Sequence, residues 1–172
     1  MAMAETSRSG RYERLPEYRS GVFAWAACAL LLGILVYVFD RGGRAAFLPA
    51  VLFSPKAIAL FGPIANVLPS FAHTFSFTLF IALILRPANI YGVCGFWMAI
   101  EIACELLQLP DVGQLLRTAE FDSTELGKYI VLYSTNGTFD VRDLAAIVLG
   151  GVCATWLWNR YRGDHNETNT DS

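Results

Sequence analysis

The sequence predicts an all-α polytopic integral membrane protein with four transmembrane helices, and three observations lead to this prediction. Charged residues make up only 16% of the 172 residues and hydrophobic residues 55%, whereas soluble domains carry about 25% charge. The charges gather at the two ends and in two loops. The stretches between these segments are apolar and long enough to cross a hydrocarbon layer of about 30 Å.

The first predicted span covers residues 21–39, which include no charged residue. This stretch is longer than the apolar core of about 7–15 residues found in a cleavable signal peptide. Residues 1–20 before it form a polar tail that cannot build a core. Asp40 and the glycines and arginines that follow it end the span.

The second predicted span covers residues 70–85. Pro63, Asn66 and Pro69 interrupt the uncharged run before it, so the segment after the first span is expected to lie at the membrane interface or to be re-entrant. A protein with five spans, in which residues 45–68 also cross the bilayer, is the alternative.

The third predicted span covers residues 88–109 and ends at Pro110 and Asp111. A long polar loop follows, in which a short helix is expected at most. The fourth span covers residues 141–158, and residues 159–172 form a second polar tail. The four spans therefore make one transmembrane domain over residues 21–158.

The orientation follows from the positive-inside rule. With the N-terminus inside, the cytoplasmic segments contain slightly more Lys and Arg than the outer segments. Both termini are therefore expected in the cytoplasm of a cell whose inner membrane holds this multi-pass protein. No Lys/Arg patch is interleaved with aromatic residues, so nothing in the sequence indicates a nucleic-acid partner.

Because spans alternate in direction, the start of the second, the end of the third and the start of the fourth lie at one membrane face. Each of these three segments carries polar residues. They are His73 on the second span, Glu101, Glu105 and Gln108 on the third, and Asp140, Arg142 and Asp143 on the fourth. The topology therefore predicts one polar site at the outer face.

The spacing of Glu101, Glu105 and Gln108 puts all three on one face of a helix. A carboxylate inside a membrane is costly unless it is paired, protonated or next to a wet cavity. Glu105 is the candidate general acid or base, with His73 as its proton partner. Glu101, Gln108, Asp140, Arg142 and Asp143 are candidate binding residues.

Two other readings of these residues stay open. Polar side chains in membrane helices often only join helices through hydrogen bonds, and Asp140 is also suited to cap the N-terminus of the last helix. If the two aspartates hold a divalent ion instead, their oxygen ligands favour Mg²⁺, Mn²⁺ or Ca²⁺ over zinc. The sequence identifies no cofactor.

Three segments, FAHTFSFTLF, EIACELLQLP and GTFDVRDLAAIVLGG, resemble the VanZ-like membrane protein family. Its pattern is a His at the head of one span, E-x-x-Q at the end of the next, and F-D-x-x-D before a Gly-rich helix. The matching residues are His73, Glu105 with Gln108, and Asp140 with Asp143. The chain has Gly137 where the family often has an Arg before the Phe-Asp pair.

This resemblance implies a bacterial envelope protein, some relatives of which are associated with resistance to glycopeptide antibiotics. We expect a polar site that binds or processes a lipid or a lipid-linked head group. The alternative is a non-catalytic accessory or scaffold subunit of a membrane or envelope complex. The expected partners are the bilayer itself and either a lipid-linked ligand or another membrane protein.

Overall fold

The structure is a computed structural model that describes residues 17–40, 60–119 and 121–168, and all regular structure in these ranges is helical. The elements are α1 (Glu17–Phe39), η2 (Gly62–Asn66), α2 (Leu68–Leu85), α3 (Ile90–Leu106), α4 (Pro110–Thr118), η3 (Phe121–Ser123), α5 (Glu125–Asn136) and α6 (Val141–Thr168). Most of the predicted N-terminal tail and most of the predicted interfacial segment lie outside the described residues.

The four longest described helices correspond to the four predicted spans. Three of them, α1, α2 and α6, contain stretches that are long and apolar enough to cross a membrane. A fourth crossing is obtained if α3 and α4, which meet at a bend of 77°, count as one broken span. The described part of the chain is thus an all-helical assembly with three to four candidate spans.

The last helix continues beyond the predicted end of the fourth span. It begins at Val141 and reaches Thr168, through residues predicted to be a polar tail. Arg162 explains part of this extension, because its Nη1 donates hydrogen bonds to the carbonyl oxygens of Pro87 and Ala88, at 3.2 and 3.1 Å. The extension of α6 is therefore held against the turn between α2 and α3.

The predicted long loop before the last span is also more ordered than expected, since it forms α4, η3 and α5. Pro110 begins α4 instead of ending the structure, because proline is well accepted in the first turn of a helix. Thr124 caps α5 by accepting a hydrogen bond from the backbone N–H of Gly127 at 3.0 Å, as Thr often does at this position.

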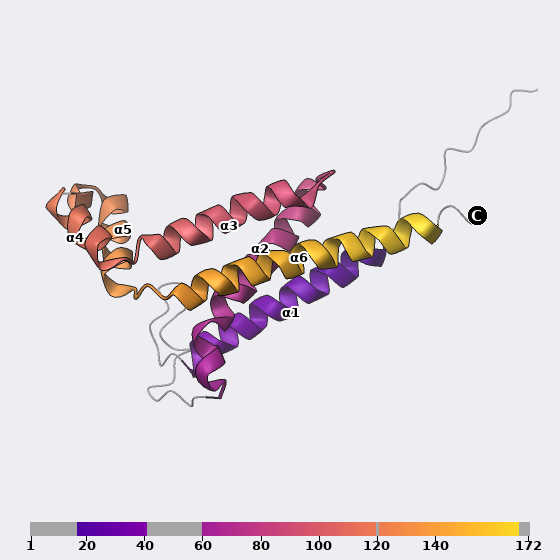
Figure 1. The fold of residues 1–172 in the computed structure, drawn as a ribbon, viewed down its shortest axis with the longest axis horizontal. Coiled ribbons are helices and arrows are strands. Elements are labelled where there is room, and N and C mark those ends of the chain that lie inside the picture. The colour runs from indigo at the N-terminus through magenta and orange to yellow at the C-terminus, as the bar shows by residue number, and fades with distance from the viewer. Residues whose placement is uncertain (1–16, 41–59, 120, 169–172) are drawn as a thin grey trace, which may run out of the picture.

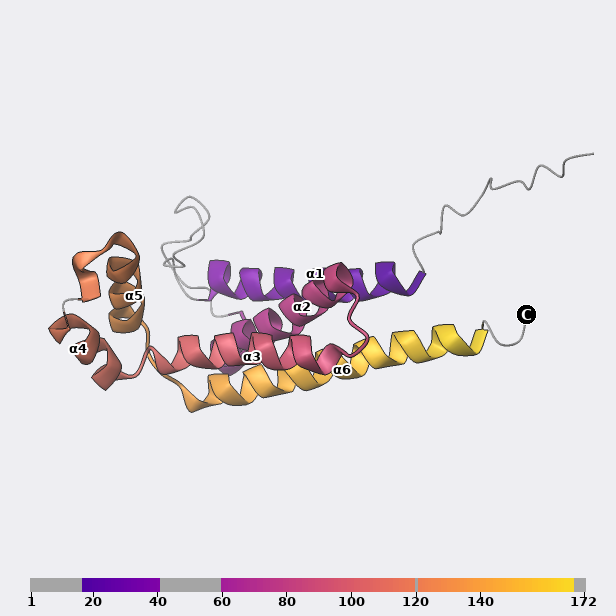
Figure 2. The ribbon, with the colours of Figure 1, turned by 90° about the horizontal axis from the view of Figure 1, so that it is seen from above.

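The second helix occupies the centre of the bundle. It packs against α1, α3 and α6 and runs obliquely between α1 and α3 (Figure 1, Figure 2). At Gly150 of α6, an added Cβ would stand 2.7 Å from the carbonyl oxygen of Phe71 and 3.2 Å from Cβ of Thr74. Glycine at this position allows α2 and α6 to approach closely, as small residues do in membrane bundles.

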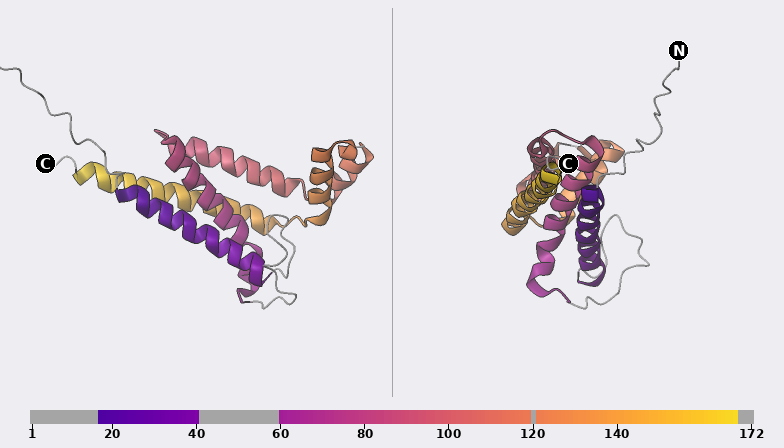
Figure 3. Two further views of the ribbon diagram at one scale, coloured as in Figure 1. Left: turned by 180° about the vertical axis from the view of Figure 1, so that it is seen from behind. Right: turned by 90° about the vertical axis from the view of Figure 1, so that its right-hand side faces the viewer.

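The two ends of the bundle differ in character. The end where α1 begins and α6 finishes faces the viewer in the right-hand view of Figure 3. Arginines gather there, and the Nη2 of Arg19 donates to the carbonyl of Leu83 at 2.7 Å. The apolar core also lies toward this end, where Val22, Leu79 and Trp158 are buried. The opposite end carries the predicted site residues.

The outward faces of the long helices are apolar. Large hydrophobic side chains stand exposed along α1, α3 and α6, among them Phe23, Leu31, Phe96, Leu149 and Val152. Soluble monomers rarely expose apolar surface on this scale. A lipid environment would cover these faces.

Candidate functional site

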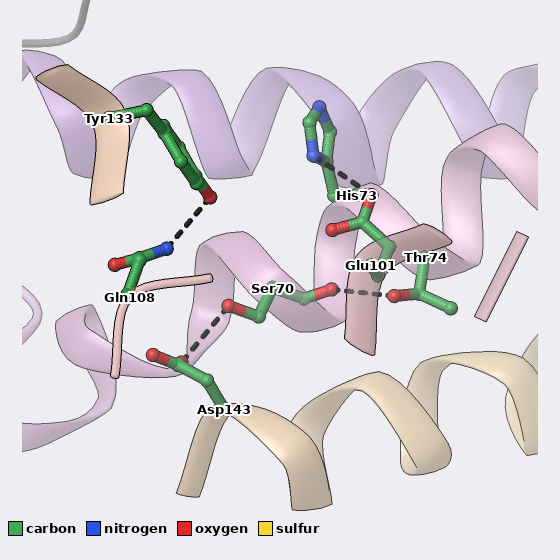
Figure 4. Close-up of polar contacts among 7 residues, drawn as sticks. All are labelled: Ser70, His73, Thr74, Glu101, Gln108, Tyr133 and Asp143. Carbon is green, nitrogen blue, oxygen red and sulfur yellow. Dashed lines mark hydrogen bonds and ion pairs between the residues drawn. The ribbon is translucent and has the colours of Figure 1, made fainter. Parts of the chain in front are cut away.

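A cavity of about 500 Å³ lies at the end of the bundle opposite the arginines. Its polar lining comes from α2, α3, α5, α6 and the turns beside them, and its remaining wall is apolar, with Leu30, Gly33 and Ile34 supplied by α1. The polar lining residues are Asn66, Ser70, His73, Glu101, Cys104, Glu105, Gln108, Tyr133, Asn136, Thr138, Asp140 and Asp143. Figure 4 shows several of these side chains and their contacts.

His73 pairs with Glu101. The imidazole Nδ1 lies 3.3 Å from Oε1 of Glu101, and their side chains are 50% and 15% exposed. The ring stands edge-on against Phe77, with centroids 4.8 Å apart, and Phe77 stacks on Trp97. The sequence assigned His73 to Glu105, but Glu101 lies one turn earlier on α3, where it meets the second turn of α2.

Glu105 joins the end of α3 to the start of α6. It is only 7% exposed, and its Oε1 accepts a hydrogen bond from the backbone N–H of Asp140 at 2.9 Å. Asp140 caps α6 in turn, because its Oδ1 accepts from the backbone N–H of Arg142 at 2.9 Å. The predicted capping role of Asp140 is confirmed, and Glu105 positions that cap.

Asp143 joins α6 to α2. Its Oδ1 accepts a hydrogen bond from the hydroxyl of Ser70 at 3.0 Å (Figure 4). Ser70 stands three residues before His73, so both side chains lie on one side of α2. The two carboxylates Glu105 and Asp143 therefore each cross between helices and enter the cavity lining.

Gln108 lies in the turn that follows α3 and packs over Gly137. Its Nε2 donates to the hydroxyl of Tyr133 at 2.7 Å. Partial burial of this phenol, together with the nearby Cys104, Glu105 and Glu101, raises the pKa of Tyr133 to about 12 despite the hydrogen bond from Gln108. The Tyr133 hydroxyl accepts this hydrogen bond at the edge of the cavity.

The structure brings together nearly all the predicted site residues. His73, Glu101, Glu105, Gln108, Asp140 and Asp143 line the same cavity. Arg142 does not line it: its side chain is exposed. The location of the cluster at one level of the bundle is as predicted, while the catalytic and binding roles assigned to its members stay predictions.

Sequence reasoning missed several lining residues. Ser70 could have been predicted from the sequence, because its spacing from His73 places both residues on one helix face. Tyr133, Asn136 and Thr138 were not, because they belong to a segment that was read as a loop. No local pattern indicates that this segment folds back over the end of α3.

The cavity is acidic. Four carboxylates and one imidazole line it, and within the described residues no Lys or Arg side chain does. No group of three His, Cys, Asp or Glu side chains in the described ranges has the geometry to hold a metal ion. Such a lining offers many hydrogen-bond acceptors and suits a ligand rich in hydroxyl or ammonium donors.

A comparison of the chain with protein-family models, with curated proteins and with solved structures finds no match.

Proposed function

We propose that this chain is a multi-pass inner-membrane protein similar to the VanZ-like family, and that its cavity binds the polar head group of a lipid or lipid-linked molecule. The cavity carries this proposal because its lining is amphiphilic. One wall is apolar and belongs to α1, while the others present carboxylates, amides and hydroxyls from α2, α3, α5 and α6. An amphiphile matches both parts.

The membrane setting is supported by the distribution of side chains on α3. Glu101, Glu105 and Gln108 line the cavity, whereas Phe96 on the other side of the helix is 65% exposed. Polar residues that turn inward and apolar residues that turn outward are what a lipid environment requires. The arginine-rich end is then cytoplasmic and the cavity opens at the outer face.

The head group is best supported as a donor-rich one, such as a sugar or an amine. Carboxylates accept hydrogen bonds, and a free phosphate would be repelled by an acidic lining. If the site also transfers a proton, the pair of His73 and Glu101 is the group suited to it, since the two are already within 3.3 Å. Glu105 and Asp143 would then orient the ligand.

The experiment uses the full chain extracted together with its surrounding lipid in polymer-bounded nanodiscs, and native mass spectrometry identifies retained lipid. The site variant is Glu105→Gln with Asp143→Asn, which keeps both side-chain shapes and removes two charges. The matched control is Asp111→Asn with Glu125→Gln, two exposed carboxylates on α4 and α5. We expect only the site variant to lose the bound species. Its affinity for that species should fall about tenfold for each 1.4 kcal/mol of lost binding free energy.

Equal retention in wild type and both variants would reject the binding site. The accessory or scaffold reading would then lead, and co-purification of a stoichiometric protein partner would be its positive sign. A retained free phosphate without an attached sugar or amine would contradict the donor-rich ligand. Alkaline carbonate washing of membranes tests the premise separately, because a chain released by the wash does not span the bilayer.

A further inference from the structure

One side of α5 is apolar and exposed. Leu126, Tyr129 and Tyr133 stand at i, i+3 and i+7, which places them in one stripe along the helix. They are 71%, 70% and 41% exposed. Two of the three are thus among the most exposed large apolar side chains of the described part of the chain.

The neighbouring elements α4 and η3 do not cover this stripe. The opposite side of α5 is the buried one, with Gly127, Val131 and Ser134 inside. Ser134 there donates a hydrogen bond to the carbonyl of Leu107, which attaches α5 to the end of α3. The stripe therefore faces away from α4 and η3.

The direction of α5 shows what the stripe faces. Helix α5 runs across the long axis of the bundle in both Figure 1 and Figure 2, just beyond the end of α3. The side chain of Tyr133 points from α5 toward the bundle, where its hydroxyl meets Gln108 (Figure 4). Leu126 and Tyr129 lie in the same stripe as Tyr133, and their side chains are more exposed than that of Tyr133.

We propose that α5 lies flat on the outer surface of the bilayer, with Leu126 and Tyr129 inserted at the level of the lipid head groups. This rests on the proposed function, since it requires that α1, α2, α3 and α6 span the membrane. A helix that crosses the direction of the spans lies parallel to the membrane plane. Tyrosine is enriched at that level because its ring is apolar and its hydroxyl polar.

The polar residues of α5 fit this placement. Lys128 is adjacent to Tyr129 in sequence but about 100° away around the helix. Its ion-pair partner at 2.6 Å, Glu125, stands four residues before Tyr129 and therefore lies at the edge of the stripe, where Lys128 draws the carboxylate toward the polar side. A helix with an apolar side toward lipid and charges toward water is the usual form of an interfacial helix.

The cavity gains a defined entrance from this arrangement. Tyr133 belongs both to the stripe and to the cavity lining. If the stripe marks the lipid–water boundary, the cavity opens at that boundary. A head group then reaches Glu105 and Asp143 without leaving its own membrane leaflet.

The test places a spin-labelled amino acid by codon suppression at one position of the full chain, so that the native cysteines remain. The chain is reconstituted in vesicles of phosphatidylethanolamine and phosphatidylglycerol, and collision rates with oxygen and with a water-soluble nickel chelate are measured. Position 129 tests the stripe, position 128 is its matched control on the same helix, and position 96 on α3 tests the spanning premise. We expect oxygen to dominate at 129 and 96, and the nickel chelate at 128.

Each other outcome has a distinct meaning. If 96 remains in lipid and 129 is as accessible to nickel as 128, α5 stands in water and the inference is wrong while the proposed function stands. If 129 is shielded from both reagents, protein covers the stripe, and the inference is equally wrong. If 96 itself is accessible to nickel, the chain does not span the bilayer and the proposed function fails with it.

Discussion

At the scale of single residues, the absence of a side chain at position 137 sets the position of Gln108. A Cβ on Gly137 would lie 2.2 Å from Oε1 of Gln108, so any other residue there would displace the carboxamide. The hydrogen bond from Gln108 to Tyr133 therefore depends on glycine at position 137.

The pKa of Tyr133 lies above that of an ordinary tyrosine side chain. Its pKa is raised to about 12, against about 10 for an ordinary tyrosine. Because the folded chain keeps this proton to higher pH than the unfolded chain, the resulting stability is complete below about pH 10 and is lost as the pH rises through about 12. The measurement is the ultraviolet absorbance titration of wild type minus Tyr133→Phe.

The difference spectrum should show one ionisation near pH 12 and nothing near pH 10. Tyr129→Phe, which alters an exposed tyrosine of the same helix, is the control. A difference spectrum for Tyr133 with its midpoint near pH 10 would contradict the hydrogen-bonded, partly buried position described above.

Glu105 should matter for folding through hydrogen bonding and not through charge. Glu105→Gln keeps an oxygen that can accept from the N–H of Asp140, so we expect little change in the melting temperature. Glu105→Leu leaves that partly buried N–H without its Glu105 acceptor and should cost about 1–3 kcal/mol. Thermal unfolding in detergent checks both.

The comparison residue for this prediction is His73, which is half exposed in its pair with Glu101. Its replacement by Gln keeps a hydrogen-bond donor beside the mostly buried Glu101, so we expect a cost of about 1 kcal/mol. A larger loss of stability for His73→Gln than for Glu105→Leu would contradict this prediction. The contact of His73 with Glu101 would then stabilise the fold more than the hydrogen bond of Glu105 to Asp140.

The sequence predicted that these polar residues gather at one end of the bundle, but it did not predict that His73 contacts Glu101, for a physical reason. Alternation of the spans fixes the level of each residue along the membrane normal. It does not fix the rotation of α2 against α3, which decides whether His73 meets Glu101 or Glu105. That rotation depends on packing between helices, here of Phe77 on Trp97, which the local sequence does not encode.

At the scale of helices, the length of the apolar stretches was enough to predict the long helices, whereas polar composition did not predict the short ones. The helices α1, α2, α3 and α6 lie where uncharged or nearly uncharged stretches predicted them. The segment that forms α4 and α5 was predicted as a polar loop with room for one short helix, because Asp111, Arg117 and Glu125 suggest a solvated loop. Their ends are instead defined by Pro110 at the first turn of α4 and the Thr124 cap of α5.

The close approach of α2 and α6 gives a prediction with an internal control. Gly150→Ala places a methyl group 2.7 Å from the carbonyl oxygen of Phe71, and we expect a loss of about 1–3 kcal/mol from overpacking. Gly92→Ala on α3 meets nothing within 4 Å. It should instead gain up to about 1 kcal/mol from the higher helix propensity of alanine.

Melting temperatures of the two variants should therefore move in opposite directions. A stabilised Gly150→Ala would mean that α2 and α6 are further apart than described. A loss for both variants of similar size would point to a general cost of alanine at glycine positions and not to this contact.

At the scale of the whole molecule, the expected orientation rests on a small excess of Lys and Arg at one end, four in the described residues against Arg117, Lys128 and Arg142 at the other, and the positive-inside rule assigns the richer end to the cytoplasm. Arg19, Arg86, Arg160 and Arg162 belong to the end where α1 begins and α6 finishes. Glu101, Glu105, Asp140 and Asp143 belong to the other. We expect a membrane-impermeant maleimide to label Glu125→Cys in intact cells and Arg160→Cys only after permeabilisation.

Both variants are made in a Cys104→Ser background, because Cys104 lines the cavity. That background without a further cysteine is the blank, since the other three cysteines lie in α1, α3 and α6. Labelling of Arg160→Cys but not of Glu125→Cys in intact cells would invert the orientation. The cavity would then open toward the cytoplasm, and its ligand would come from the inner leaflet.

The order of synthesis makes the assembly of this bundle late. Helix α2 packs against α1, α3 and α6, yet α6 is the last of these to leave the ribosome. Until it does, the side of α2 that meets Gly150 has no protein neighbour, and Glu105 has no backbone N–H from Asp140 to bond. A chain cut short before Val141 would lack both Asp143 and the helix that packs against α2 at Gly150. Nonsense mutations upstream of the Val141 codon should accordingly leave no partly working protein, only a fragment cleared by proteases.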